Sequence, residues 1–157
     1  MKVAVLMGSP SDKDKMAPAV EMLSKFGLEP DERVLSAHRT PKAVAEFAQS
    51  ARANGYVALI CGAGMAAHLA GAVAGNTTLP VIGVPLSGSA LNGVDSLYAT
   101  VQMPKGIPVA TVAIDGAANA AILVAEIVAV TDPAMAKRLD EFRATFAGPS
   151  GRERETQ

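Results

Sequence analysis

The chain has 157 residues, of which 50% are hydrophobic and 18% charged, and its 14 Lys and Arg nearly balance 15 Asp and Glu. This length fits one domain, predicted over residues 1–147, and the near-neutral charge offers no basic surface for nucleic acid or anionic lipid. We therefore expect neither as a partner. Cys61 is the only cysteine, Gly8 and Pro10 interrupt the place where a signal peptide needs an apolar run, and no apolar run reaches the roughly 20 residues of a membrane span. These features predict a cytoplasmic protein.

Short apolar runs alternate along the chain with segments whose apolar residues repeat at helical spacing. The predicted strands are 2–7, the segment around 33–35, 57–61, 80–84 and 108–114. The predicted helices are 12–26, 41–53, 66–75, 94–101, 117–130 and 133–146. Such alternation is typical of a parallel sheet with helices on both faces. We predict a three-layer α/β sandwich with a flavodoxin-like sheet of order 2-1-3-4-5 and a C-terminal helix.

In a sheet of this order, ligands bind beyond the carboxyl ends of the strands, where the strand order reverses between the first and the third strand. This rule selects the loops 8–12, 36–40, 62–68 and 85–93 as the candidate binding edge. The C-terminal segment 148–157 combines Gly, Pro and Ser with alternating charges, and it is predicted to be disordered or to form an arm over a neighbouring molecule.

Both histidines of the chain, His38 and His68, fall in these loops, which favours a functional role for at least one of them. His38 lies in the segment SAHRTP, residues 36–41, where Arg39 offers planar donors for a phosphate and a helix start supplies free N–H groups. This pattern indicates an anion site. An alternative interpretation makes Arg39 a solvated charge and the neighbouring hydroxyl residues turn and capping residues.

The segment GSPSD, residues 8–12, follows the first strand and opens a helix, a position where α/β proteins bind phosphate groups. No G-x-x-x-x-G-K-[ST] sequence occurs, so hydrolysis of a nucleoside triphosphate has no support. Asp12 would repel a phosphate placed against it. We assign it either to the hydroxyls of a sugar diol or to the cap of the following helix.

The segment GAGMAA, residues 62–67, satisfies the G-x-G-x-x-A pattern of dinucleotide sites, but it follows the third strand and lacks an acidic residue about 20 residues further on. Its glycines are better explained by a ligand close to the backbone or by a tight turn. Cys61, His38 and His68 match no known spacing of metal ligands, and no G-x-S-x-G sequence is present. We therefore expect neither a bound metal nor a serine hydrolase.

Taken together, these loops give the sequence a close resemblance to the class I N5-carboxyaminoimidazole ribonucleotide mutases, bacterial enzymes of purine biosynthesis. The resemblance spans residues 3–139 and is carried by the segments MGSPSD (7–12), SAHRTP (36–41), GAGMAAHLAG (62–71), LPVIGVP (79–85), ALNGVDSLYATVQMPKGIPVATVAI (90–114) and GAANAAIL (116–123). In the related carboxylases that use free CO2, Lys takes the place of Arg39. The chain departs from the family at Met65, where a glycine is usual, at Ala70, where a proline is usual, and over LSGSALNG (86–93), where VQSAALSG is usual.

The resemblance implies a mutase that moves a carboxylate from the exocyclic nitrogen of N5-carboxyaminoimidazole ribonucleotide to ring carbon four, without ATP, metal, biotin or another cofactor. It implies that His38 transfers the proton, for which an ordinary histidine pKa of about 6.5 is suited. The residues that it places at the ribonucleotide are Ser9, Asp12 on the ribose, Arg39 on the phosphate, Ser11 and Ser36 as further contacts, and Gly64 and His68 beside CO2 and the imidazole. Two alternatives stay open: an aminoimidazole ribonucleotide carboxylase that uses CO2, and a nucleotide-binding module without catalysis.

The resemblance also implies a homo-oligomer, and specifically an octamer. The sequence gives an independent reason, because residues 117–130 are apolar nearly all round a helix and the surplus faces must be covered. The alternative is that the helix 133–146 and the tail cover these faces within one chain.

Overall fold

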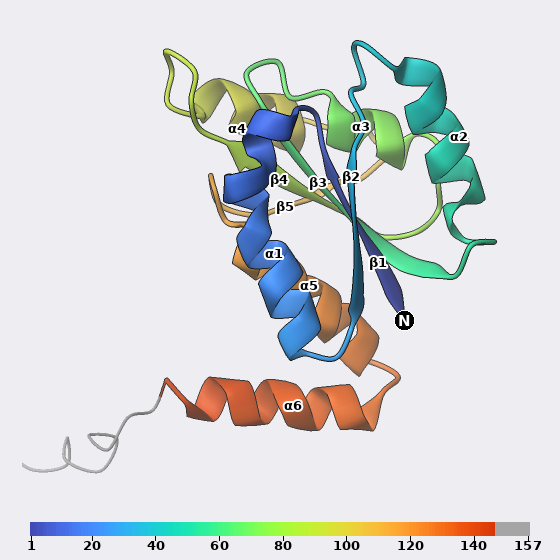
Figure 1. The fold of residues 1–157 in the computed structure, drawn as a ribbon, viewed down its shortest axis with the longest axis vertical. Helices are drawn as coiled ribbons and strands as arrows, with labels where there is room; N and C mark the ends of the chain where they lie inside the picture. The colour runs from blue at the N-terminus through green and yellow to red at the C-terminus, as the bar shows by residue number, and fades with distance from the viewer. Residues whose placement is uncertain (147–157) are drawn as a thin grey trace, which may run out of the picture.

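The computed structural model describes residues 1–146, which form a five-stranded parallel sheet between two layers of helices (Figure 1). The strand order is β2-β1-β3-β4-β5, which confirms the prediction. The strands are β1 (Lys2–Met7), β2 (Glu29–Val34), β3 (Tyr56–Gly64), β4 (Val81–Leu86) and β5 (Ala110–Thr111). The helices are the 3-10 helix η1 (Pro10–Asp12), α1 (Lys13–Lys25), α2 (Pro41–Ala51), α3 (Leu69–Ala74), α4 (Val94–Val101), α5 (Ala117–Ala129) and α6 (Pro133–Ala144). The predicted tail, 148–157, lies outside the described residues, as does residue 147 of the predicted domain.

Strand β1 is an inner strand whose side chains are buried on both faces of the sheet. Val3, Val5 and Met7 belong to one hydrophobic core, and Ala4 and Leu6 belong to the other. This division follows from the two-residue period of a strand, which sends successive side chains to opposite faces. A strand covered on both sides needs apolar residues at every position, which is why its sequence is a continuous apolar run.

The helices divide between these two cores. Helices α1, α5 and α6 contribute to the core that contains Val3, and α2 and α3 contribute to the core on the opposite face (Figure 1). Helix α4 packs against β4, where Gly83 leaves room for Thr100: a Cβ at residue 83 would overlap the Thr100 Cγ2 and lie 3.4 Å from the Ala70 Cβ. Among the described residues, no helix combines the length and the apolarity that crossing a membrane requires.

The bounds of the strands differ from prediction most at the two edges of the sheet. Strand β2 begins at Glu29 instead of near residue 33. The prediction missed this start because the sequence EPDERV is polar, largely exposed and without an apolar pattern. Strand β5 holds 2 residues instead of the predicted 108–114. The inner strands run longer than predicted, since β3 and β4 remain paired up to Gly64 and Leu86. The prediction ended these strands too early because they contain glycines and Pro85, residue types that usually mark the end of a strand.

The turn after β1 differs from prediction as well. The chain forms η1 before α1 begins, and the Ser9 hydroxyl accepts a hydrogen bond from the Ser11 N–H at 3.3 Å as the cap of this short helix. Asp12 occupies the predicted N-cap position of α1, but its side chain makes no capping hydrogen bond there. Its carboxyl group lines the cavity described below.

Helix α5 is apolar around most of its circumference, yet the same chain covers most of it. Six of its 13 residues are buried in the core shared with α1 and α6, and Ile122, Leu123 and Ala129 are partly buried against the same core. Glu126, its one carboxylate, accepts a hydrogen bond from Arg143 of α6 at 2.5 Å. Ile127 is 37% exposed, and Val130, just beyond the helix, is 84% exposed. Packing within one chain therefore accounts for the composition of α5, and that composition gives no separate reason for a second subunit.

Candidate functional site

A cavity of about 750 Å³ lies at the carboxyl ends of β1, β2, β3 and β4, at the edge selected from the strand order. Its volume is within the range of sites for small organic ligands. All four predicted loops contribute to its lining. The eight residues singled out from the sequence all line it: Ser9, Ser11, Asp12, Ser36, His38, Arg39, Gly64 and His68.

The two histidines come from different loops and meet at the wall of the cavity. The rings of His38 and His68 pack edge to face, with centroids 5.2 Å apart and ring planes at 75°. A second cavity of about 450 Å³ lies against the same rings, and apart from these two residues its lining is apolar, with Ala66, Ala99 and Met103 among the lining residues. Both histidines are exposed, so their rings are free to exchange protons with a bound ligand.

Arg39 reaches across the end of β1 from the neighbouring loop. Its Nη2 donates to the Gly8 carbonyl oxygen at 2.7 Å, and its Nε donates to the Ser36 hydroxyl at 3.3 Å. The Thr40 hydroxyl closes the loop on itself by accepting from the Ser36 N–H at 3.1 Å and donating to the Ser36 carbonyl at 3.0 Å. The contacts of Arg39 with Gly8 and Ser36 orient its guanidinium. Because a guanidinium carries five N–H donors, other donors remain for an anion.

The first loop adds hydroxyl groups and a carboxylate. The Ser11 hydroxyl donates to the Ser9 hydroxyl at 2.8 Å. Burial raises the pKa of Asp12 above its usual value, although the Ser9 backbone and the charges of Lys15 and Arg39 act in the opposite direction. A carboxylate is an acceptor, which suits the hydroxyls of a sugar better than a phosphate.

Besides His68, the third loop contributes Gly64 and Met65 to the lining of the cavity. A Cβ on Gly64 would lie 3.3 Å from the Leu86 carbonyl oxygen, so the close approach of the next strand accounts for this glycine. Met65 follows with φ of 54°, in the left-handed region that residues other than glycine rarely adopt. Its side chain is 66% exposed at the cavity. The G-x-G pattern therefore marks a strand end and a tight turn.

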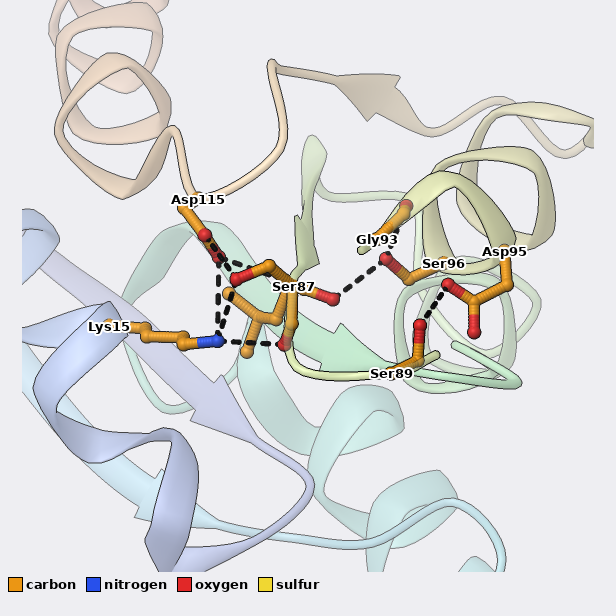
Figure 2. A network of polar contacts seen from close by, with 8 residues as sticks. Lys15, Ser87, Ser89, Gly93, Asp95, Ser96 and Asp115 are labelled. Carbon is orange, nitrogen blue, oxygen red and sulfur yellow. Dashed lines mark hydrogen bonds and ion pairs between the residues drawn. The ribbon is translucent and has the colours of Figure 1, made fainter. Parts of the chain in front are cut away.

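One side of the cavity is formed by Ser87 and Gly88, which lie in the predicted loop 85–93, and by Lys15, which sequence reasoning missed. The Lys15 ammonium donates to the carbonyl and hydroxyl oxygens of Ser87 at 2.7 and 2.8 Å (Figure 2). Asp115 joins this cluster by accepting from the Ser87 N–H at 2.9 Å. The spacing of Lys15, three residues after Asp12 at the start of the helix, could have pointed to it, whereas no local signal marks Asp115.

The arrangement brings together groups for three tasks. Arg39 and the nearby hydroxyls can hold an anion, Asp12 can accept hydrogen bonds from a diol, and the histidines can move a proton. Among residues 1–146, no three His, Cys, Asp or Glu side chains gather as a metal-binding cluster. Burial raises the pKa of the Cys61 thiol far above its usual value, so this side chain does not supply a thiolate nucleophile.

Three comparisons relate the chain to known proteins. Residues 2–148 match the family model described as AIR carboxylase. The N5-carboxyaminoimidazole ribonucleotide mutase of Vibrio cholerae is 50% identical over 146 residues, which cover 92% of this chain and 91% of that protein. The protein of the same name from Aquifex aeolicus is 54% identical over 138 residues, covering 88% and 83% of the two chains. The crystal structure of Treponema denticola PurE has a TM-score of 0.85 and 31% sequence identity, and the match covers 93% of this chain and 91% of that one.

Proposed function

Because the chain belongs to the AIR carboxylase family, we propose that its cavity converts N5-carboxyaminoimidazole ribonucleotide into 4-carboxy-5-aminoimidazole ribonucleotide, a step of the biosynthesis of purines (IMP). Relatives at about 50% identity over most of their own length carry the name of this mutase. The observation that carries the proposal is the cavity itself, where four loops gather eight residues with the acceptors, donors and acid/base groups that this substrate needs.

The reaction moves a carboxylate within one molecule, and its atoms balance without a second reactant. The bond between the exocyclic nitrogen and the carboxyl carbon breaks, CO2 is released, and the nitrogen takes up a proton. The electron-rich ring carbon four then attacks CO2, and the proton on that carbon leaves. Since one proton is taken up and one is given back, a single acid/base group suffices, and no ATP, metal or biotin enters the balance.

His38 is that acid/base group. An imidazole gives and takes protons near neutral pH, and His38 is exposed at the wall of the cavity. His68 packs against it, with 5.2 Å between the ring centroids, and with Gly64 it lines the part of the cavity that receives CO2 and the imidazole ring of the substrate.

The ribose phosphate of the substrate lies across the first two loops. Arg39 binds the phosphate, because its guanidinium is oriented by Gly8 and Ser36 and keeps further donors free. The hydroxyls of Ser9, Ser11 and Ser36 support the same group, and Asp12 accepts hydrogen bonds from the ribose hydroxyls.

A comparison of two substrates tests the proposal. Purified enzyme is given either N5-carboxyaminoimidazole ribonucleotide or aminoimidazole ribonucleotide with bicarbonate, without ATP, and formation of the 4-carboxy product is followed. We expect product from the first substrate at a much higher rate. Product from the second pair alone would assign the chain to the carboxylases that use CO2, and turnover of neither would make it a nucleotide-binding module.

We further propose that the protein is a homo-octamer in the cytoplasm, as the family resemblance implies. One side of α4 offers a surface for another subunit, because Val94, Tyr98 and Val101 repeat at helical spacing and are 44%, 61% and 46% exposed. The free, buried thiol of Cys61 agrees with a reducing compartment. Light scattering should give about 128 kDa, the mass of eight 16.0 kDa chains, whereas the mass of one chain would contradict this assembly.

A further inference from the structure

We propose that Lys15 is a positioning residue that fixes the loop between β4 and α4, residues 87–93, as one wall of the cavity, and that it does so through Ser87. This inference rests on the proposed function, because it concerns the same cavity. Lys15, Ser87 and Asp115 all fall outside the six segments that carry the family resemblance.

The contacts join three separate parts of the chain at Ser87 (Figure 2). From α1, the Lys15 ammonium donates to the Ser87 carbonyl at 2.7 Å and to its hydroxyl at 2.8 Å. From the connection between β5 and α5, Asp115 accepts from the Ser87 N–H at 2.9 Å and from its hydroxyl at 2.5 Å. Lys15 Nζ and Asp115 Oδ1 are 4.0 Å apart. All the polar atoms of Ser87 thus have partners outside its own loop.

The loop needs such an anchor because its pairing with the sheet has ended. Strand β4 pairs with β3 as far as Leu86, one residue before the loop begins. Strand β5 pairs with β4 only at Ile82 and Gly83, well before the loop begins. Within the loop, the Ser89 hydroxyl donates to Asp95 of α4 at 2.8 Å, which connects the loop to the helix that follows it. The near end is held by Lys15 and Asp115, at the residue that faces the cavity.

The geometry of the cluster favours the ionised form of Asp115. Burial acts to raise the pKa of Asp115, but the hydrogen bonds from Ser87 and the charge of Lys15 outweigh it and lower the pKa below the usual value. The carboxylate therefore remains ionised opposite the ammonium. Lys13, on the same helix, provides a contrast: its side chain is 66% exposed, against 35% for Lys15, and it pairs with Glu32 at 3.4 Å outside the cavity lining.

Hydrogen exchange on the full chain tests the anchor without any substrate. We expect the amides of residues 87–93 to exchange about tenfold faster in Lys15→Met, while those of β1 and β3 keep their rates, because the change opens one loop and not the core. Lys13→Met is the matched control and should exchange as the wild type does. Equal exchange of the loop in Lys15→Met and wild type would overturn the proposal. If Lys15→Met does not fold, Asp115→Asn takes its place, since Asn also tolerates the φ of 56° found at this position.

Steady-state kinetics with N5-carboxyaminoimidazole ribonucleotide test the positioning role. Lys15→Met should raise KM about tenfold and change kcat by no more than about twofold, because the wall moves while the acid/base group stays in place. Lys15→Arg should restore part of the loss, and Lys13→Met should match the wild type. Since both charged residues act through Ser87, Lys15→Met combined with Asp115→Asn should be no worse than the stronger single change.

The possible failures are distinguishable. If the increase in KM of the variant with both Lys15→Met and Asp115→Asn equalled the product of the two single increases, Lys15 would contact the substrate directly. That result would overturn a role through Ser87. A loosened loop with unchanged KM would likewise overturn the positioning role. A wild-type protein that converts no substrate would refute the proposed function, and hydrogen exchange would then decide by itself whether Lys15 fixes the loop.

Discussion

The cavity has two ends that are built in different ways. At the β2 end, Ser36, His38 and Arg39 belong to one loop, and Arg39 donates hydrogen bonds to the Ser36 hydroxyl, 3 positions away in the sequence. At the β4 end, the bonds of Ser87 to Lys15 and Asp115 join residues 72 and 28 positions apart. Local bonds, together with one bond from Arg39 to the Gly8 carbonyl 31 positions away, orient the β2 loop while leaving His38 and Arg39 exposed for a ligand. Long-range bonds occupy the polar groups of the β4 end, so the first end is suited to chemistry and the second to fixing the shape of the cavity.

The largest expected effect is at the β2 end, in His38→Asn. Removing the acid/base group should lower kcat by about 10²- to 10⁴-fold, while substrate affinity changes little. Because His38 is exposed, the thermal unfolding midpoint should remain that of the wild type, which serves as the control for folding. Turnover close to the wild type would exclude His38 from proton transfer. It would also contradict the assignment of the chemistry to the β2 end of the cavity.

A smaller effect is expected at the same end when Arg39 is changed to Gln. Loss of the guanidinium group should weaken binding of the ribonucleotide about 10- to 100-fold and leave binding of the dephosphorylated nucleoside nearly unchanged. Calorimetric titration with both ligands measures the difference. Arg52→Gln is the control, because Arg52 bonds to Thr78 away from the cavity. Equal losses for the two ligands would show that Arg39 does not bind the phosphate.

Between the two ends, Met65→Gly should stabilise the protein. Met65 has φ of 54°, and relief of this left-handed conformation should raise the free energy of unfolding by about 0.5–1 kcal/mol. Urea denaturation measures this change. Met65→Ala keeps the Cβ that causes the strain and should show no such gain. A lower stability of the glycine variant would mean that the exposed methionine side chain contributes more than the backbone costs.

The smallest effect is expected at the β4 end, from the titration of Asp115. Its folded-state pKa is lowered, so the stability it contributes is present above the unfolded value of 3.8 and is lost as the pH falls through the folded value. Because the side chain is 40% exposed, the wild type should exceed Asp115→Asn by only about 0.2–0.5 kcal/mol at neutral pH. Urea denaturation across the acid range measures the difference. A difference that persisted unchanged well below that pKa would exclude the charge as its cause.

The architecture could be predicted because its inner elements carry strong local patterns. The continuous apolar run of β1 and the helical spacing of Met16, Leu23 and Phe26 in and after α1 reflect burial that periodicity reports directly. The edge strand β2 could not be bounded in this way, since half of its surroundings are solvent and its residues are polar. Likewise, α5 misled the argument for an oligomer, because the packing of α6 onto it leaves no trace in its own sequence.

The same distinction explains which part of the site was predictable. His38 and Arg39 were found because their loop is contiguous and the strand order places it at the binding edge. Lys15 and Asp115 were missed because each is an ordinary charged residue until the fold brings it to Ser87. The loop 85–93 was predicted at the binding edge, but residues that act through long-range contacts have no motif, so its contacts with Lys15 and Asp115 required the structure.

The central claim is that the cavity moves the substrate's own carboxylate from nitrogen to carbon. It is tested most directly with N5-carboxyaminoimidazole ribonucleotide whose carboxyl carbon is isotopically labelled, incubated with the enzyme in unlabelled bicarbonate, and with mass spectrometry of the product after a single turnover. We predict that the product keeps the label in its new carboxylate, because CO2 is recaptured before it leaves the cavity. A product whose carboxyl carbon comes from the unlabelled bicarbonate would contradict this claim.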